Sequence, residues 1–328
     1  MNNTKIKAIA DSAVGAALCT LLIMISLYVP ILAAFAAIVC GLPVMLLFYK
    51  HNITSGILAF FCAFLLSFIL TGNIVSVGVA MLTYAAPAAV FGLFNSKGHK
   101  FSTSVIAAAA VTLVGVVIEF GMLNGSGTGI RDSIAAYSSQ VQNLFNEAVS
   151  SSGIEVGSDM SAAVAQAFEQ VIDGIMYYLP TFIICIAVFY AYAISMIGVF
   201  VMKRLRVKNI EYVRFNKLVA PKFVCHITVL LFVVTLIAKD NGVYTAALKN
   251  VLLVSEIALG VCGFAFLDLK FSGVLKQWYI RLVIYIGAWF SVFMMIPVLA
   301  DVLVLIGFFR SLYLNPLGNG SGGKNHEG

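Results

Sequence analysis

The stretch MKRLRVKNIEYVRFNKLVAPK, residues 202–222, lies between two long apolar runs and decides how the rest of the chain is interpreted. It holds seven cations against one acid, Glu211. Short loops rich in Lys and Arg stay on the cytoplasmic side of a membrane. The stretch therefore predicts a membrane protein with this loop in the cytoplasm. Its cations are Lys203, Arg204, Arg206, Lys208, Arg214, Lys217 and Lys222.

The composition of the chain excludes a soluble globular fold. Of its 328 residues, 61% are hydrophobic and only 10% are charged, and the mean hydropathy is +1.02. Soluble domains carry about 25% charged residues. The formal charge of +6 does not indicate nucleic-acid binding, because the cations lie in short loops at the ends of apolar runs rather than along one face.

The apolar runs predict an all-α, polytopic integral membrane bundle of about nine or ten transmembrane helices. Crossing the bilayer takes about 20 apolar residues in a helix, since lipid offers backbone groups no hydrogen-bond partners. Pro297 either kinks one long helix or turns a hairpin, so both counts stay open. The expected spans are 9–28, 32–49, 53–71, 74–94, 102–123, 177–202, 221–238, 245–267 and 279–296.

The distribution of cations predicts the orientation of the chain. If the spans alternate and the last segment is left aside, fifteen cations fall on one side and three on the other, namely Arg131, Lys239 and Lys249. This asymmetry places the N-terminus in the cytoplasm. Lys5 and Lys7 precede an apolar run without a small-residue cleavage site, so this run is expected to remain as the first span. The expected location is the bacterial cytoplasmic membrane, with multiple passes.

One polar segment interrupts the apolar runs. Residues 124–176 carry six acids and one base, and apolar residues recur there at helical spacing over 134–148 and 160–175. Two amphipathic helices outside the membrane are expected, either as a packed connecting lid or as a gating lid or partner-docking arm. The predicted division is an N-terminal membrane bundle of about five helices, this acidic extracytoplasmic insert, a C-terminal membrane bundle and a disordered tail, over 1–123, 124–176, 177–317 and 318–328.

Ionisable residues inside spans are candidates for function because they are rare and costly there. Glu256 lies near the middle of its span, where a proton-coupling or substrate-contacting role competes with a neutral hydrogen bond between helices. Glu119 lies near the outer end of its span, either as a surface carboxylate that pairs with Arg131 or as a binding residue. Asp11 and His226 lie near the inner ends of their spans, where interfacial roles are expected.

Three polar or aromatic residues gather toward the outer side. Tyr28 and Asn73 lie at span ends, and Tyr84 lies half-way down the fourth span. They either line an outward-facing pocket or, in the case of Tyr28, anchor the helix at the interface.

Small residues recur at four-residue spacing in the first span, which allows close helix packing in lipid. Ala13 and Ala17 form one such pair. The helix face that carries these small residues is expected either to pack inside the bundle or to dock another membrane protein.

Motifs for common chemistry are missing. The chain has no G-x-x-x-x-G-K-[ST] loop, no H-E-x-x-H and no G-x-S-x-G, and its cysteines form no C-x-x-C pair. The sequence therefore predicts no enzyme activity, no cofactor and no metal site.

Several short stretches carry a family resemblance over most of the chain. They are LYVPI (27–31), GLPV (41–44), YKHN (49–52), LTGN (70–73), PAAVFGL (87–93) and GFFR (307–310). With the basic loop after the sixth span, they resemble the YybS-like membrane proteins of Gram-positive bacteria, the DUF2232 family. That family has no assigned biochemical activity.

The front half of the family is in turn similar to the substrate-binding subunits of energy-coupling-factor transporters. Those subunits use an Ala-x-x-x-Ala face on the first helix to dock on the transport module, and Ala13 and Ala17 match that pattern. The resemblance implies a transporter-like small-molecule-binding subunit that takes energy, if any, from a partner. The alternative is a non-transporting scaffold or regulator in cell-envelope assembly.

Overall fold

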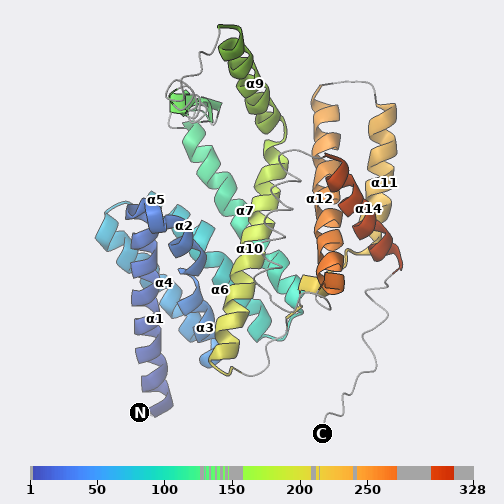
Figure 1. Cartoon of the computed structure of the whole chain (residues 1–328). Coiled ribbons are helices and arrows are strands. Elements are labelled where there is room, and N and C mark those ends of the chain that lie inside the picture. The colour runs from blue at the N-terminus through green and yellow to red at the C-terminus, as the bar shows by residue number, and fades with distance from the viewer. Residues whose placement is uncertain are drawn as a thin grey trace. The chain divides into compact units, whose positions relative to one another are not determined.

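The chain folds into helices arranged in two compact units (Figure 1). A computed structural model describes residues 3–125, 158–207, 212–213, 215–238, 242–271 and 297–313, and positions scattered between 129 and 147. Every regular element in these ranges is a helix, which confirms the predicted all-α class. The first unit is Met1–Tyr212 and the second is Val213–Gly328.

Seven helical segments are long and apolar enough to cross a membrane within the described ranges. Their outward faces carry large apolar side chains with high exposure, such as Ile31 at 93%, Ile69 at 73% and Phe189 at 71%. Such faces are stable in lipid and unfavourable in water, so the fold is that of a multispanning membrane protein. The seven segments are Lys5–Tyr28, Ile31–Lys50, Ile53–Thr71, Ile74–Ser96, Phe101–Met122, Leu179–Arg204 and Tyr244–Phe271.

The predicted count of nine or ten helices stays a prediction. The expected span 221–238 corresponds to an apolar helix of 16 residues, Lys222–Ile237. The expected span 279–296 and the expected tail 318–328 lie outside the described residues. A further helix begins at Pro297 and ends at Tyr313.

Turn chemistry divides the first unit into its helices. Pro30 begins α2, and Asn52 caps α4 because its Oδ1 accepts a hydrogen bond of 2.8 Å from the Ser55 amide. Gly72 ends α4 in the left-handed region with φ of +66°. The elements are α1 (Asn3–Tyr28), α2 (Pro30–Val39), α3 (Leu42–Lys50), α4 (Ile53–Thr71), α5 (Ile74–Ala80), the π-helix η1 (Met81–Ala85), α6 (Ala86–Ser96), α7 (Phe101–Gly125), α9 (Ser158–Tyr177) and α10 (Leu179–Arg204).

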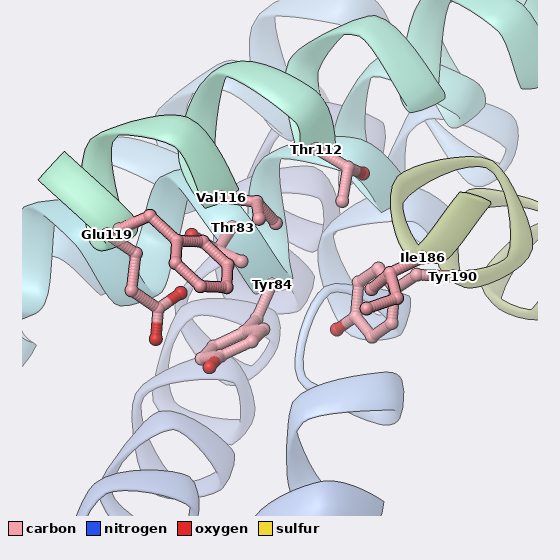
Figure 2. A pocket seen from close by; sticks show the side chains of 8 residues that line it. Thr83, Tyr84, Thr112, Val116, Glu119, Ile186 and Tyr190 are labelled. Atoms are coloured by element: carbon pink, nitrogen blue, oxygen red, sulfur yellow. The ribbon is translucent and has the colours of Figure 1, made fainter. Parts of the chain in front are cut away.

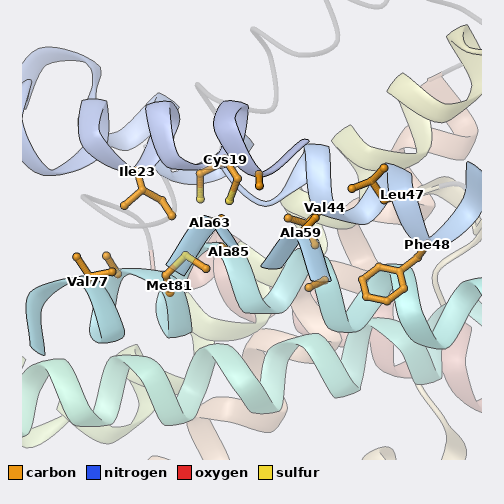
Figure 3. Close-up of a cluster of buried hydrophobic side chains, with 14 residues drawn as sticks. Cys19, Ile23, Val44, Leu47, Phe48, Ala59, Ala63, Val77, Met81 and Ala85 are labelled. Atoms are coloured by element: carbon orange, nitrogen blue, oxygen red, sulfur yellow. The ribbon is translucent and has the colours of Figure 1, made fainter. Parts of the chain in front are cut away.

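The core of the first unit is built from small side chains on facing helices (Figure 3). Ala16 and Cys19 of α1 pack against Ala59 and Ala63 of α4, all at most 1% exposed. Thr20 of α1 donates a hydrogen bond of 3.3 Å to the carbonyl of Ala63. Small residues let the two backbones approach closely, which is how helices associate in lipid.

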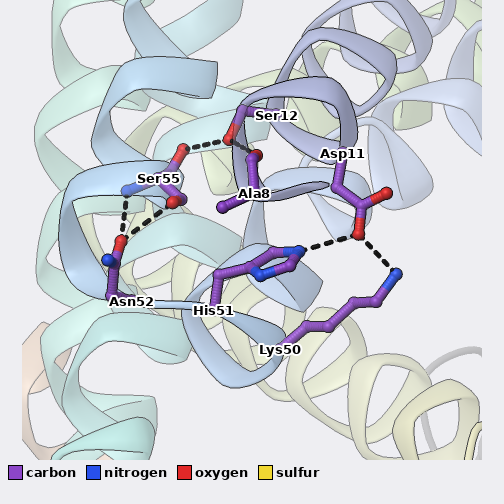
Figure 4. Close-up of polar contacts among 7 residues, drawn as sticks. All are labelled: Ala8, Asp11, Ser12, Lys50, His51, Asn52 and Ser55. Carbon is purple, nitrogen blue, oxygen red and sulfur yellow. Dashed lines mark hydrogen bonds and ion pairs between the residues drawn. The ribbon is translucent and has the colours of Figure 1, made fainter. Parts of the chain in front are cut away.

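A polar cluster ties α1 to the start of α4 (Figure 4). The Asp11 carboxylate lies 2.6 Å from Lys50 Nζ and 2.7 Å from His51 Nε2. Ser12 donates to the carbonyl of Ser55 at 3.3 Å. Asp11 is therefore an ion-pair partner in the first half of α1.

The second unit contains η2 (Phe215–Lys217), α11 (Lys222–Ile237), α12 (Val243–Phe271) and α14 (Pro297–Tyr313). Helices α12 and α14 cross so closely that a Cβ on Gly307 would lie 1.8 Å from the Leu259 carbonyl oxygen. The buried Arg310 donates hydrogen bonds to the carbonyls of Cys262, at 3.3 Å, and Asn216, at 2.7 Å. Arg310 therefore ties η2 to α12 and α14.

The two units differ from the division expected at 176/177. Helix α10 packs against α7, α6 and α3 and belongs to the first unit. Of the expected insert, the second amphipathic helix is present as α9, Ser158–Tyr177. Most of the segment 134–148, where the first was expected, lies outside the described residues.

Candidate functional site

A π-turn interrupts the fourth span half-way along its length. The amide of Ala86 donates to the carbonyl of Met81, five residues back, instead of the usual four. Pro87 provides the local cause, because it has no N–H to offer the Thr83 carbonyl and its ring would clash there. Single π-turns inside helices are frequent at functional sites. This one carries Thr83 and Tyr84.

Gly115 of α7 holds the π-turn against the rest of the bundle. A Cβ at this position would lie 2.7 Å from Thr83 Oγ1 and 2.9 Å from Thr83 Cα. Only a residue without a side chain permits this approach. The position of the Thr83 side chain therefore depends on Gly115.

Two cavities that share lining residues lie beside the π-turn, and Figure 2 shows the first. The first has a volume of about 220 Å³ and is bounded by η1, α7 and α10. The second has a volume of about 280 Å³ and is bounded by α1, α2, η1 and α10. Tyr84 and Tyr190 line both and stand between them. The first is lined by Thr83, Tyr84, Thr112, Val116, Glu119, Phe120, Ile186 and Tyr190, and the second by Ser26, Ala33, Ala37, Ile38, Tyr84 and Tyr190.

Two residues that line the first cavity carry polar groups without partners. Thr83 is 3% exposed, and its hydroxyl makes no hydrogen bond within the described part of the chain. The half-buried Glu119 carboxylate has no hydrogen-bond or ion-pair partner among those residues. Buried polar groups are normally satisfied, so an unpartnered hydroxyl beside a cavity calls for a water or a ligand.

The two tyrosines that separate the cavities come from distant parts of the chain. Their rings meet edge to face with 6.1 Å between centroids. The Tyr190 hydroxyl donates a hydrogen bond of 2.7 Å to the carbonyl of Ala37, which ties α10 to α2. The ring of Tyr190 is thereby fixed, while the Tyr84 hydroxyl has no partner in the described ranges.

Of the five residues expected to bind a ligand, the structure brings two together. Glu119 and Tyr84 line the same cavity. Tyr28 is 65% exposed at the end of α1, and Asn73 is exposed and accepts hydrogen bonds from the amides of Val75 and Ser76 as the cap of α5. Neither lines a cavity described here.

Glu256 belongs to the second unit and lies on α12, partly exposed. Its carboxyl group interacts electrostatically with that of Asp301 on α14. Glu256 is not among the residues that line the two cavities beside the π-turn.

The expected pairing of Glu119 with Arg131 is not observed. Arg131 instead donates to Asp173 of α9 at 3.0 Å and lies 3.9 Å from Glu169. Arg131 is thus paired with two exposed carboxylates of α9 rather than with Glu119. Glu119 is left facing the cavity.

Thr83, Thr112 and Tyr190 line the cavity but were not singled out from the sequence. Tyr190 did carry a signal, because a tyrosine in the middle of a span, away from the interface, needs a partner for its hydroxyl. The signal for Thr83 was Pro87, because a proline inside a helix leaves the carbonyl four residues earlier without its hydrogen bond.

Within the described ranges, no three His, Cys, Asp or Glu side chains come together in an arrangement that would hold a metal ion. The polar groups at the cavity are one carboxyl, hydroxyls and phenols. This set suits an organic ligand.

Comparison with known proteins points to one family. Comparison with curated proteins and with solved structures finds no match. Residues 17–309 match the model of a family described as "Predicted membrane protein (DUF2232)", which covers most of the chain and both units. With its membrane-spanning helices, the chain belongs to the DUF2232 family of predicted membrane proteins.

Proposed function

We propose that the first unit is a transporter-like, small-molecule-binding membrane subunit and that the cavity beside the π-turn is its ligand site. The observation that carries the proposal is the convergence of two unpartnered polar groups, Thr83 and Glu119, on a cavity with mostly apolar walls. Ligand sites in proteins are apolar hollows with a few directed polar groups. The proposal takes up the expectation, drawn from the sequence, that the front half resembles the substrate-binding subunits of energy-coupling-factor transporters.

The proposed orientation gives the ligand a route of entry. With the N-terminus in the cytoplasm of a bacterial cell, Glu119 lies near the outer end of α7, and Tyr190 lies about half-way along α10. The cavity then occupies the outer half of the membrane. The ligand would enter from outside the cell.

The first helix offers a face for a partner that would supply energy. Ala13 and Ala17 are exposed on α1, as are their neighbours Val14 at 60% and Leu18 at 48%, whereas Ser12 and Ala16 are buried at 3% and 1%. Small exposed residues allow a helix of another membrane protein to pack closely. We therefore assign Ala13 and Ala17 to docking of a transport module, and the residues behind them to the core.

Ligand-dependent thermal stabilisation tests the proposal. Purified protein in detergent is screened against a metabolite library that contains cations, anions and neutral compounds. A ligand that binds the folded state raises the melting temperature by mass action. Val116→Phe, which fills the cavity, should abolish the response. Val117→Phe, which adds the same ring at a neighbouring position 53% exposed, should retain it.

Two results would overturn the proposal. Either no compound stabilises the wild type, or Val116→Phe responds as the wild type does. Stable co-purification of envelope proteins in place of any ligand response would favour the alternative, a scaffold or regulator in cell-envelope assembly.

A further inference from the structure

We propose that the cavity recognises a small organic cation, an ammonium group carried on a compact apolar or aromatic body. This inference rests on the proposed function and adds the chemical class of the ligand. Three features of the cavity support it: its charge, its rings and its size.

The cavity is lined by one acidic side chain and by no basic one among the described residues. Glu119 is the single ionisable carboxyl among the described residues that line it, and none of those residues carries a positive charge. An ionised carboxyl in a membrane span is costly unless it is paired. Because Arg131 is held by Asp173 and Glu169, an ammonium ligand would supply the counter-charge that the described chain does not.

Two tyrosine rings line the cavity and could stabilise a bound cation by cation–π interaction. Tyr84 and Tyr190 line both cavities, and the Glu119 carboxyl is close enough to Tyr84 to interact with it electrostatically. Figure 2 shows the Glu119 carboxyl and the Tyr84 ring side by side at one end of the cavity. A cation within about 6 Å of a ring centroid is attracted by the ring face, by up to about 2 kcal/mol when desolvated.

The remaining walls suit a compact body. Val116, Phe120 and Ile186 provide apolar surface for the body of such a ligand. Each cavity is smaller than the roughly 300–1,000 Å³ of pockets for drug-sized ligands. A ligand of one ring and a short aminoalkyl chain would occupy one cavity and place its cation at Tyr84.

A matched series of probes tests the class of ligand. The probes are 2-phenylethylamine, 2-phenylethanol and 3-phenylpropanoate, which share a ring and differ in charge. Apparent affinities come from the rise in melting temperature with probe concentration. The amine should bind the wild type at least about tenfold more tightly than the alcohol, and the carboxylate should not bind.

Two glutamine variants test which carboxyl group causes the preference for the amine. Glu119→Gln should remove the preference for the amine and leave weak binding of the alcohol unchanged. Glu256→Gln, which neutralises a carboxyl in the other unit, should leave all three affinities as in the wild type.

The inference is overturned if the amine gives no stabilisation, if the alcohol or carboxylate binds as well, or if Glu119→Gln retains the preference. Its failure is distinguishable from that of the proposed function. A neutral or anionic library compound whose effect is lost in Val116→Phe would sustain the ligand site while refuting its preference for cations.

Discussion

Gly115 and Thr83 are in direct contact, because a Cβ on Gly115 would lie only 2.7 Å from Thr83 Oγ1. This contact joins α7 to the π-turn at the wall of the cavity. The geometry of the proposed ligand site therefore depends on a glycine that touches no ligand.

Gly115→Ala should displace the π-turn and damage the site. Overpacking of this kind costs about 1–3 kcal/mol of unfolding free energy, and the shift of Thr83 should also weaken ligand binding. Gly121→Ala is the matched control on the same helix, because a Cβ there would meet nothing within 4 Å. Melting curves with and without ligand provide the measurement. Equal behaviour of the two variants would contradict the account.

Tyr190→Phe should separate the structural role of Tyr190 from its role in binding. The change removes the hydrogen bond to the Ala37 carbonyl and keeps the ring. Hydrogen bonds between membrane helices are worth about 0.6 kcal/mol on average, so a small drop in melting temperature is expected. Binding of the ammonium probe should persist. Tyr190→Leu, which removes the ring, should weaken it, and an unchanged affinity in that variant would argue against a cation–π contact.

Gly263→Ala should destabilise the second unit. Its Cβ would lie 2.1 Å from the Leu303 carbonyl oxygen, so α12 and α14 would have to move apart. We expect a loss of about 1–3 kcal/mol in unfolding free energy. Gly260→Ala on the same helix meets only Val304 Cγ2 at 3.8 Å and should be tolerated. A destabilisation of the same size in both variants would refute the tight crossing.

Arg310→Lys should loosen the segment that precedes α11. Arginine reaches the carbonyls of Asn216 and Cys262 with two nitrogens, and lysine offers a single point charge. Limited proteolysis should then cut near residues 215–220 more rapidly than in the wild type. Arg204→Lys, at an exposed position of α10, serves as the control and should not change the cleavage rate. Protection unchanged in Arg310→Lys would show that the two hydrogen bonds are dispensable.

Two variants, each with one added cysteine, test the predicted orientation. Glu169→Cys and Lys217→Cys both replace exposed residues, one on α9 and one in the basic stretch 202–222. A membrane-impermeant maleimide should label the first in intact cells and the second only after permeabilisation, because basic loops stay in the cytoplasm. The wild type, with its six native cysteines, gives the background. Labelling of Lys217→Cys in intact cells would show that the basic stretch lies outside the cell and would contradict the predicted orientation.

The helical membrane fold was predictable because it follows from local properties. Length and apolarity mark the spans, and the first helices begin and end close to the expected bounds. The choice of interior face was not predictable. Ser12 and Ala16, and Ala13 and Ala17, show the same four-residue spacing, and only the position of α4 decides that the first pair is buried.

The candidate site was predictable only where a residue stands out by its own chemistry. Glu119 and Tyr84 stand out as polar groups in apolar spans, and each can be identified alone. Tyr190 gains its role by contact with Ala37, 153 positions earlier. The boundary expected at 176/177 follows a change in polarity, whereas the compact units divide between Tyr212 and Val213 because α10 packs on α7.

Native mass spectrometry of the purified protein tests the ligand site most directly. The account predicts that protein taken from its own membranes carries a small adduct in the wild type and in Val117→Phe, and that Val116→Phe carries none. An adduct of unchanged abundance in Val116→Phe, or its absence from all three proteins, would contradict the claim that this cavity binds a small molecule.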